Sequence, residues 1–354
     1  MLNYIGVKTA YIGTIGFYLD NKKETLDNTT PSIDILYNLI NKAKNNNCKV
    51  VVMEVSSHAL KQNRVYGLLF DAICVTNITN DHLDYHKTKK DYIKSKKKII
   101  YMLKNKKICI LNKNDKYYKK FIDKKNNNYL LGKDVKVIKI NKTVNNTSVS
   151  FKDDVKYSIN LSLVGNYNLY NFLMAYKIIK ELNFEYKTIL NNSYLFLPPS
   201  GRMEKINYKT NTIFIDYAHT PDAVLNVLKN VKKLKNKGII TIIGCGGNRD
   251  KTKRKKMANI ACYYSKYVIF TNDNPRFEDE KQIISDMLKG AKGKYEIIYD
   301  RYDAIKEGIN LLKDNMILMI LGKGHEDYQI IGNNKYYFKD KEVVEKLVGA
   351  LEIK

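Results

Sequence analysis

The sequence predicts an α/β protein of two domains with mainly parallel sheets. Short apolar runs rich in β-branched residues alternate with longer segments of helical periodicity, which is typical of strands joined by crossover helices. Polar clusters directly follow several of these runs, and a segment with two prolines and a glycine, residues 197–201, interrupts the periodic pattern. We therefore expect one domain in residues 1–198 and a second in residues 199–354.

In the first domain, apolar runs are expected to form strands and periodic segments to form helices. The expected strands are residues 50–55, 72–76 and 108–111, the expected helices are residues 31–40, about 89–103 and about 167–182, and short strands are expected between residues 129 and 163. Thr30 is expected to cap the first helix, with Pro31 at its first position, because these residue types are favoured there.

The second domain shows the same alternation beyond residue 201. Strands are expected near residues 212–215, 238–243, 267–270, 296–299 and 316–320. The segments between them are long enough for helices, so a mainly parallel sheet is predicted.

Composition is typical of a globular protein with reduced cysteines. Of the 354 residues 44% are hydrophobic, and no stretch has the roughly 18 consecutive apolar residues of a membrane helix. The first residues lack a basic segment followed by a long apolar run, which argues against a secretory signal. The cysteines are scattered without CxxC spacing, which argues against disulfides and a zinc site. We expect a cytoplasmic monomer without a membrane span.

The net charge of +26 raises the question of a nucleic-acid partner. The excess of lysine accompanies an excess of Asn, Ile and Tyr, a joint bias that is typical of an AT-rich coding sequence. We therefore expect no nucleic-acid partner, although a basic surface would attract phosphorylated substrates.

Polar clusters follow two successive strands of the first domain, at residues 54–58 and 76–86. One acidic residue at a strand end is often structural. Glu54 after one strand, and His82 among acidic residues after the next, together favour a hard cation and phosphate chemistry.

Four further clusters follow strands of the second domain, at residues 216–222, 244–250, 273–276 and 322–326. Ligands of open α/β sheets bind beyond the carboxyl ends of the strands. Glycines in the second cluster would let backbone amides approach an anion, although tight turns need glycine in any case. The four clusters together predict a ligand site at this edge of the sheet.

These clusters carry a resemblance to a known family. The strings are MEVSSHAL, NDHLDYH, LVGNYNLYN, GRME, DYAHTPDA, GCGGNRDKTKR, DNPR and GKGHEDYQ. In this order and spacing they resemble the MurE subfamily of Mur ligases over essentially the whole chain. The resemblance implies a Mur ligase central ATPase domain followed by a Rossmann-like C-terminal α/β domain.

The resemblance also implies a reaction and its ligands. A carboxylate of UDP-N-acetylmuramoyl-L-alanyl-D-glutamate is phosphorylated by ATP with Mg²⁺, and the amine of the incoming amino acid attacks the acyl phosphate. Implied catalytic and magnesium-binding residues are Glu54, His82 and Lys96, the last as N6-carboxylysine. Implied UDP-sugar-peptide contacts are Thr29, Thr30, Ser56, Gln62 and Arg64; implied ATP contacts are Asn77, Asn168, Asn171, Arg202 and Asp216.

Arg276 is the residue that the resemblance connects with the choice of amino acid. Its planar guanidinium suits the distal carboxylate of meso-diaminopimelate, whereas the ammonium of lysine would be repelled. An arginine that only caps a proline turn is the simpler alternative. Residues implied beside it are Arg249, Asp273, Asn274, Pro275, Gly322 and Glu326.

The chain departs from the family in one respect. No GTNGKT-type P-loop occurs in it, and the family's uridine-binding domain is not found before Met1. A misplaced start, a broken gene or a separate chain that supplies the rest would each account for this. The alternative function is accordingly a non-catalytic remnant that binds the amino acid or the UDP-sugar peptide without using ATP.

Overall fold

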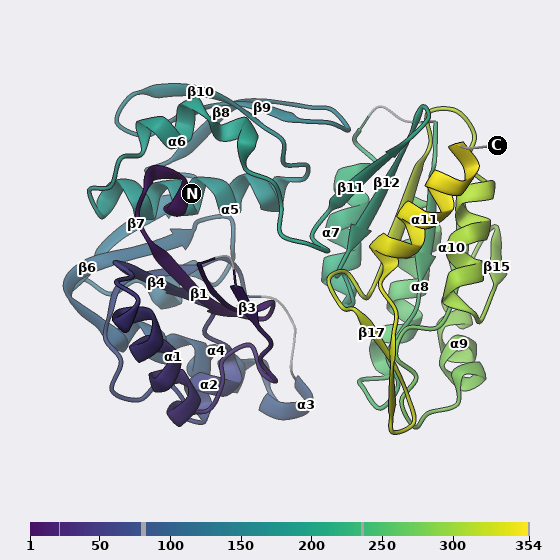
Figure 1. Ribbon diagram of the computed structural model, residues 1–354, viewed down its shortest axis with the longest axis horizontal. Coiled ribbons are helices and arrows are strands. Elements are labelled where there is room, and N and C mark those ends of the chain that lie inside the picture. Colours follow the sequence, from purple (N-terminus) through teal and green to yellow (C-terminus); the bar gives the residue numbers. More distant parts are fainter. Residues whose placement is uncertain (21, 79–82, 235–236, 353–354) are drawn as a thin grey trace. The chain divides into compact units, whose positions relative to one another are not determined.

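The computed structural model describes residues 1–20, 22–78, 83–234 and 237–352, and the contacts of the chain divide it into two compact units (Figure 1). The first unit comprises residues 1–141, 147–162 and 167–196; the second comprises residues 142–146, 163–166 and 197–354. The predicted boundary at residues 198 and 199 stays a prediction. Among the described helices, none combines the length and the apolar character needed to cross a bilayer.

The first unit contains three separate sheets, with strand orders β3-β2-β1-β4, β5-β6-β7 and β10-β9-β8. Their strands are β1 (Thr9–Gly13), β2 (Gly16–Leu19), β3 (Lys22–Glu24), β4 (Val50–Met53), β5 (Phe70–Val75), β6 (Leu103–Asn112), β7 (Asn127–Leu131), β8 (Lys136–Lys142), β9 (Thr147–Lys152) and β10 (Lys156–Leu161). The helices are α1 (Ile33–Asn45), α2 (Ser57–Lys61), α3 (Leu83–His86), α4 (Lys89–Lys97), α5 (Asn166–Glu181) and α6 (Lys187–Asn191), with 3₁₀ helices at Asn3–Ile5, Lys98–Met102, Tyr118–Phe121 and Ser193–Leu195.

Two of the apolar cores of the first unit lie against the sheets of β1 and β5. One lies between the sheet of β1 and helix α1, where Ile12, Phe17 and Leu36 are almost completely buried. The other lies against the sheet of β5, with Cys109, Leu111 and Phe121 at its centre. Strand β4 pairs only with β1, and β5 pairs only with β6, so each is an edge strand among the described residues.

The second unit is built on one six-stranded sheet of order β11-β12-β16-β13-β14-β15, with a small β17-β18 hairpin beside it. Its strands are β11 (Glu204–Tyr208), β12 (Asn211–Asp216), β13 (Ile239–Ile243), β14 (Tyr267–Phe270), β15 (Tyr295–Ile297), β16 (Ile317–Leu321), β17 (Tyr328–Ile331) and β18 (Asn334–Tyr337). Its helices are α7 (Pro221–Val231), α8 (Thr252–Tyr264), α9 (Glu280–Leu288), α10 (Arg301–Asn310) and α11 (Asp340–Glu352).

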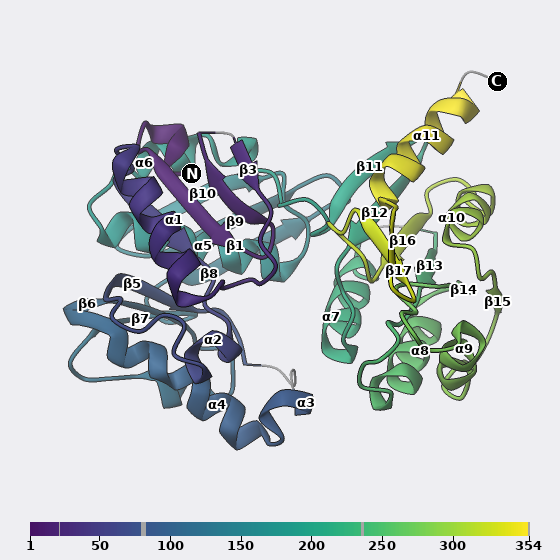
Figure 2. The same cartoon turned by 60° about the horizontal axis from the view of Figure 1, so that its bottom comes forward.

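Helices cover both faces of this sheet, with α7 and α8 on one face and α10 and α11 on the other (Figure 2). Strands covered on both faces are mainly apolar, and β13 and β16 have no exposed residue and contain one polar residue, Thr241. The core on one face joins Ile213 and Ile242 of the sheet to Ile305 of α10 and Val344 of α11. All sheet pairs are parallel except β11 with β12, as the sequence predicts for a mainly parallel sheet.

The parallel register aligns the carboxyl ends of four strands. Leu321 of β16 lies opposite both Asp216 of β12 and Ile243 of β13, and Ile243 lies opposite Phe270 of β14. The loops that follow these strands therefore start at one edge of the sheet, where the four polar clusters of the second domain are located.

The structure corrects several predicted elements. Helix α1 begins at Ile33 with Ser32 as its N-cap, so Thr30 does not cap it. Helix α4 ends at Lys97 and continues as a 3₁₀ turn, which stops where β6 begins at Leu103. The β17-β18 hairpin and the strands β2, β3 and β11 were not predicted; β3 and β18 are short and fully exposed, and such strands carry little apolar periodicity.

Candidate functional site

Glu54 occupies the carboxyl end of β4 in the first unit. Its backbone N–H donates to the Ile12 carbonyl (2.9 Å), which extends the pairing of β4 with β1. Its carboxylate accepts hydrogen bonds from the Tyr11 hydroxyl and from Thr14 Oγ1 (2.7 Å). The side chain remains exposed, so this oriented carboxylate is open to a ligand or a cation.

The predicted UDP-sugar-peptide residues form a connected cluster around Glu54. Thr29 Oγ1 lies 3.0 Å from Thr14 Oγ1. The buried Thr30 hydroxyl donates to the Glu54 carbonyl (2.9 Å) and accepts from the Ser56 N–H (3.0 Å). Thr30 thus joins two loops, which is a different role from the predicted helix cap.

Arg64 and Gln62 extend the same cluster. Arg64 Nη1 donates to the Thr30 carbonyl (2.8 Å), and its Nε donates to Gln62 Oε1 (2.7 Å). Gln62 Nε2 in turn donates to the Tyr85 hydroxyl (3.0 Å). Ser56 caps α2 by accepting from the Ala59 N–H (3.1 Å).

Lys96 lies in the last turn of α4 and is half-buried, with its Nζ 5.0 Å from the centre of the Tyr92 ring. His82, the third predicted magnesium-binding residue, lies outside the described residues. Across the part of the chain that the structure describes, no three His, Cys, Asp or Glu side chains gather as a metal-binding group. The oxygen donors around Glu54 are nevertheless of the type that Mg²⁺ prefers.

The predicted ATP contacts are distributed over both units. In the first unit, Asn77 follows β5 and is exposed, while Asn168 is buried and Asn171 exposed on helix α5. In the second unit, the Arg202 guanidinium carbon lies 4.9 Å from the centre of the Tyr217 ring.

Asp216 is buried at the end of β12 and holds two segments together. Its carboxylate accepts from the backbone N–H groups of Met203 and Ala218 (2.8 and 2.9 Å). The turn after the proline segment is therefore attached to the loop that follows β12.

The loop after β14 contains the predicted amino-acid-binding residues, and Asn274 is their central contact. Asn274 Nδ2 donates to Glu326 Oε2 (2.9 Å), and its Oδ1 accepts from the Ile330 N–H (2.9 Å). Pro275 and Asp273 are buried beside it, and the Asp273 carbonyl accepts from Gln329 Nε2 (2.8 Å).

Glu326 and Lys323 form a buried ion pair in the loop after β16. Lys323 Nζ lies 3.2 Å from Glu326 Oε2, and the lysine side chain is completely buried. Burial and the nearby Asp273 raise the pKa of Glu326, while Lys323 and Asn274 oppose this shift. Lys323 lies in the predicted polar cluster at residues 322–326 but was given no role there, and its complete burial beside Glu326 makes it a further functional candidate.

Gly322 allows this loop to lie against Asp273. Its φ is +114°, and a Cβ added there would lie 2.5 Å from Asp273 Oδ2. Only glycine fits both the backbone conformation and the space.

Arg276 is held at its backbone and on one side of its guanidinium. Its N–H donates to the Ile330 carbonyl (3.0 Å), and its φ is +56°, in the left-handed region. Its Nη1 donates to the carbonyls of Gly247 (3.0 Å) and Asn274 (3.3 Å). Within the described residues its Nε and Nη2 donate no hydrogen bond, so one edge of the fork is available to a carboxylate. Arg249, in the loop before α8, is exposed.

Two amides of the glycine-rich turn after β13, which the sequence suggested as an anion cradle, donate hydrogen bonds within the protein. The Gly247 N–H donates to the Asn274 carbonyl (2.9 Å) and the Asn248 N–H donates to Glu278 (3.0 Å). These amides are used within the protein. The glycines also allow close contact between the turn and the loop after β14.

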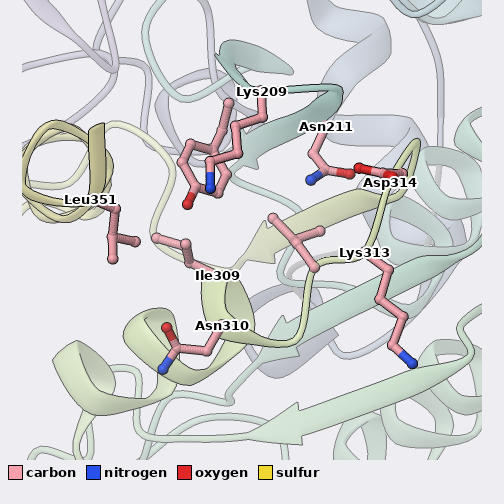
Figure 3. Close-up of a pocket in the computed structure, with 9 residues that line it drawn as sticks. Lys209, Asn211, Ile309, Asn310, Lys313, Asp314 and Leu351 are labelled. Atoms are coloured by element: carbon pink, nitrogen blue, oxygen red, sulfur yellow. The ribbon is translucent and has the colours of Figure 1, made fainter. Parts of the chain in front are cut away.

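A surface depression of about 430 Å³ lies at the opposite edge of this sheet (Figure 3). It is lined at the start of β12 by Asn211 and at the end of α10 by Asn310, with Asp314 nearby. None of the predicted site residues lines it.

Two protein-family models match this chain. The family model described as the Mur ligase middle domain matches residues 1–179, and the model described as the Mur ligase glutamate ligase domain matches residues 201–324. The chain belongs to the Mur ligase family. This confirms the fold class and the family expected from the sequence.

Relatives of this Mur ligase include proteins named for one specific reaction. A protein of Rickettsia bellii named UDP-N-acetylmuramoyl-L-alanyl-D-glutamate–2,6-diaminopimelate ligase is 40% identical over 96% of this chain and 74% of its own length. A solved structure of a protein with the same name has a TM-score of 0.68 and 27% identity, covering 99% of this chain and 74% of that one. The MurF ligase of Thermotoga maritima, solved with ADP, shares the fold at 14% identity (TM-score 0.66; 86% of this chain, 68% of that one).

Proposed function

We propose that this Mur ligase joins meso-diaminopimelate to UDP-N-acetylmuramoyl-L-alanyl-D-glutamate and converts ATP to ADP and phosphate. The relative of the same name at 40% identity supports the reaction. The observation that carries the choice of amino acid is the guanidinium of Arg276, which is hydrogen-bonded on one edge and open on the other. Arg276 lies two residues after Asn274, whose side chain donates to Glu326.

The proposed reaction has two steps. The terminal phosphate of ATP is transferred to the glutamyl carboxylate, and the amine of the amino acid then attacks the acyl carbon and displaces phosphate. One amide bond forms, and the proton of the attacking ammonium leaves to solvent or base. Position and charge stabilisation supply most of the catalysis in such a reaction.

We assign the cluster around Glu54 to the UDP-sugar peptide. Its hydroxyl, amide and guanidinium groups are hydrogen-bonded to one another, so the surface is ordered before a ligand arrives. The assigned contacts are Thr29, Thr30, Ser56, Gln62 and Arg64. The assigned ATP contacts are Asn77, Asn168, Asn171, Arg202 and Asp216.

Magnesium would be held by Glu54, His82 and the carbamate of Lys96, and would neutralise negative charge on the phosphates of ATP. The exposed, oriented carboxylate of Glu54 fits this role. The carbamate forms from the neutral lysine amine and CO₂ with loss of one proton. Protein equilibrated with ¹³C-bicarbonate should give a carbamate NMR signal that is lost in Lys96→Ala; an identical spectrum from that variant would refute the assignment.

The second unit would bind the distal end of the amino acid. The open edge of Arg276 faces a carboxylate, and Glu326, hydrogen-bonded to Asn274, accepts from an ammonium. Arg249, Asp273, Pro275 and Gly322 complete this subsite. Lysine has the same distal ammonium but a hydrogen in place of the distal carboxylate, so the guanidinium of Arg276 would find no anion to pair with and would lie beside an unneutralised cation.

Ligation by protein purified from its own cells is the direct test. Mass spectrometry should detect the tripeptide product with meso-diaminopimelate and not with L-lysine. Arg276→Lys should weaken use of meso-diaminopimelate by roughly 10- to 100-fold, because hydrogen bonds between charged groups contribute about 1.5–3 kcal/mol. Equal use of both amino acids by the unaltered protein would contradict the proposal.

The alternative is a remnant that binds these ligands without using ATP. It predicts binding of meso-diaminopimelate with no ADP release under ligation conditions, and no comparison favours it. We place the reaction in the cytoplasm and expect a monomer, which sedimentation at working concentration would test.

A further inference from the structure

Two loops of the second unit meet at the Arg276 guanidinium. One is the turn after β13, residues 244–250, and the other is the loop after β14, residues 271–279. Arg276 belongs to the second loop, and its Nη1 donates to the Gly247 carbonyl of the first (3.0 Å). The position of the guanidinium therefore depends on how these two loops are held together.

The loops touch through their backbones. The Gly247 N–H donates to the Asn274 carbonyl (2.9 Å), and a Cβ at Gly247 would lie 1.9 Å from the Pro275 carbonyl oxygen. Asn248 Oδ1 also accepts from the Phe277 N–H (3.0 Å). A shift of one loop by a few tenths of an ångström would therefore change the distance between Arg276 Nη1 and the Gly247 carbonyl.

A buried ion pair connects the two loops to helix α8. Arg254 of α8 donates through Nη1 to Glu278 Oε1 and through Nη2 to Glu278 Oε2, both at 2.7 Å. Glu278 Oε2 also accepts from the Asn248 N–H of the first loop (3.0 Å), and Arg254 Nη2 lies 3.4 Å from the Gly246 carbonyl. One bidentate pair thus contacts both loops.

The Arg254–Glu278 pair is largely buried, and its ionised form is favoured. The Arg254 side chain is completely buried and that of Glu278 is 11% exposed. Hydrogen bonds from Arg254 lower the pKa of Glu278 to about 2. Asp286 of α9 accepts from the same Arg254 Nη1 (3.0 Å), and across the described residues its hydrogen bonds include none to either loop. A buried ion pair often adds little stability compared with apolar residues of the same volume. We therefore infer the role of this pair from the way it orients the two loops.

We propose that Arg254 and Glu278 are positioning residues that set the Arg276 guanidinium for the distal carboxylate of the incoming amino acid. The proposal rests on the proposed function, because it uses that ligand. Neither residue needs to touch the substrate; they act through the turn at Gly246–Asn248 and through Arg276.

The test measures the dissociation constant for meso-diaminopimelate by calorimetry in the full chain. Glu278→Gln should raise it on the order of 10- to 100-fold, because small misplacement of a binding group has effects of this size. Asp286→Asn is the matched control, since it removes a partner of the same arginine but leaves the contact with both loops; it should change the constant less than about threefold.

A double-mutant cycle separates positioning from general destabilisation. In an Arg276→Lys background, Glu278→Gln should have almost no further effect, because the group that it positions is already absent. Additive losses would overturn the inference. Should Glu278→Gln fail to fold, Arg254→Met with Glu278→Met replaces both charges by apolar groups and must show the same loss.

The failure of the proposed function would be visible separately. If the unaltered protein does not bind meso-diaminopimelate, or if Arg276→Lys binds it equally well, the substrate assignment is wrong. If Arg276→Lys weakens binding and Glu278→Gln does not, only the positioning role is wrong.

Discussion

Glu326 combines three kinds of neighbour in one buried place. Lys323 and Asn274 contact its carboxylate, and Asp273 lies close enough to oppose its ionisation. Burial is the largest influence and raises the pKa of Glu326. Because burial and Asp273 still disfavour the ionised carboxylate despite Lys323, an ammonium of the ligand would stabilise it as a second cation.

This raised pKa predicts how stability depends on pH. The folded state favours the neutral carboxyl above its ordinary pKa of 4.5, so the contribution of Glu326 to stability becomes less favourable as pH rises from about 4.5 through the raised value. Glu326→Gln should therefore gain stability relative to the unaltered protein as pH rises across that window, measured by urea unfolding.

Glu342→Gln is the control for this measurement. Hydrogen bonds from Tyr337 and Lys339 lower the pKa of Glu342, so its contribution has the opposite sign and is lost as pH falls. The same pH trend in both variants would contradict the assignment for Glu326.

Among the elements of the second unit, the loops after parallel strands carry the candidate site and the strands supply its geometry. Leu321 and Ile243 are paired in the register, so the loops beginning at residues 322 and 244 start side by side. The β17-β18 hairpin adds contacts from beyond the sheet, since Ile330 binds both the backbone of Arg276 and the side chain of Asn274. The hairpin and the loop after β14 therefore depend on each other.

Gly322→Ala tests how closely these loops must approach. Its φ of +114° is unfavourable for alanine, and the new Cβ would lie 2.5 Å from Asp273 Oδ2. We expect a loss of about 1–3 kcal/mol in the free energy of unfolding, with weaker binding of meso-diaminopimelate.

Gly332→Ala provides the comparison. Gly332 also has a positive φ, +57°, but a Cβ there meets nothing within 4 Å. Gly332→Ala should therefore lower the free energy of unfolding only by the cost of the positive φ, without the contribution of a steric contact. Equal losses in urea unfolding would show that the contact with Asp273 is unimportant.

At the scale of the whole molecule, the two units have separate apolar cores. The core around Ile305 and Val344 involves only the second unit, and the cores around Leu36 and Phe121 only the first. Units with their own cores can unfold independently.

Calorimetry should accordingly resolve two thermal transitions. Meso-diaminopimelate should raise only one of them, by about 2.7 kcal/mol of stabilisation at a free concentration 100 times its dissociation constant, because all its proposed contacts lie in the second unit. L-Lysine should have no such effect. A single transition that shifts as a whole would contradict independent unfolding.

The sequence by itself determined the α/β class, most strands of the second sheet and the clusters of polar residues at strand ends. These follow from local properties: strands and helices have different apolar periods, and ligand-binding residues of such sheets follow the strands. Its motifs also sufficed to predict the Mur ligase family, which the comparisons confirmed. The roles of single site residues stay predictions.

Only the tertiary structure decided what several of these residues contact. Thr30 joins the loops at Glu54 and Ser56 instead of capping a helix, and the Gly247 and Asn248 amides of the glycine-rich turn donate to the Asn274 carbonyl and to Glu278. Lys323 and Arg254 resemble any other basic residues in a chain with 62 of them. Their burial and partners come from segments far apart in the sequence, and such contacts exist only after the strands are paired.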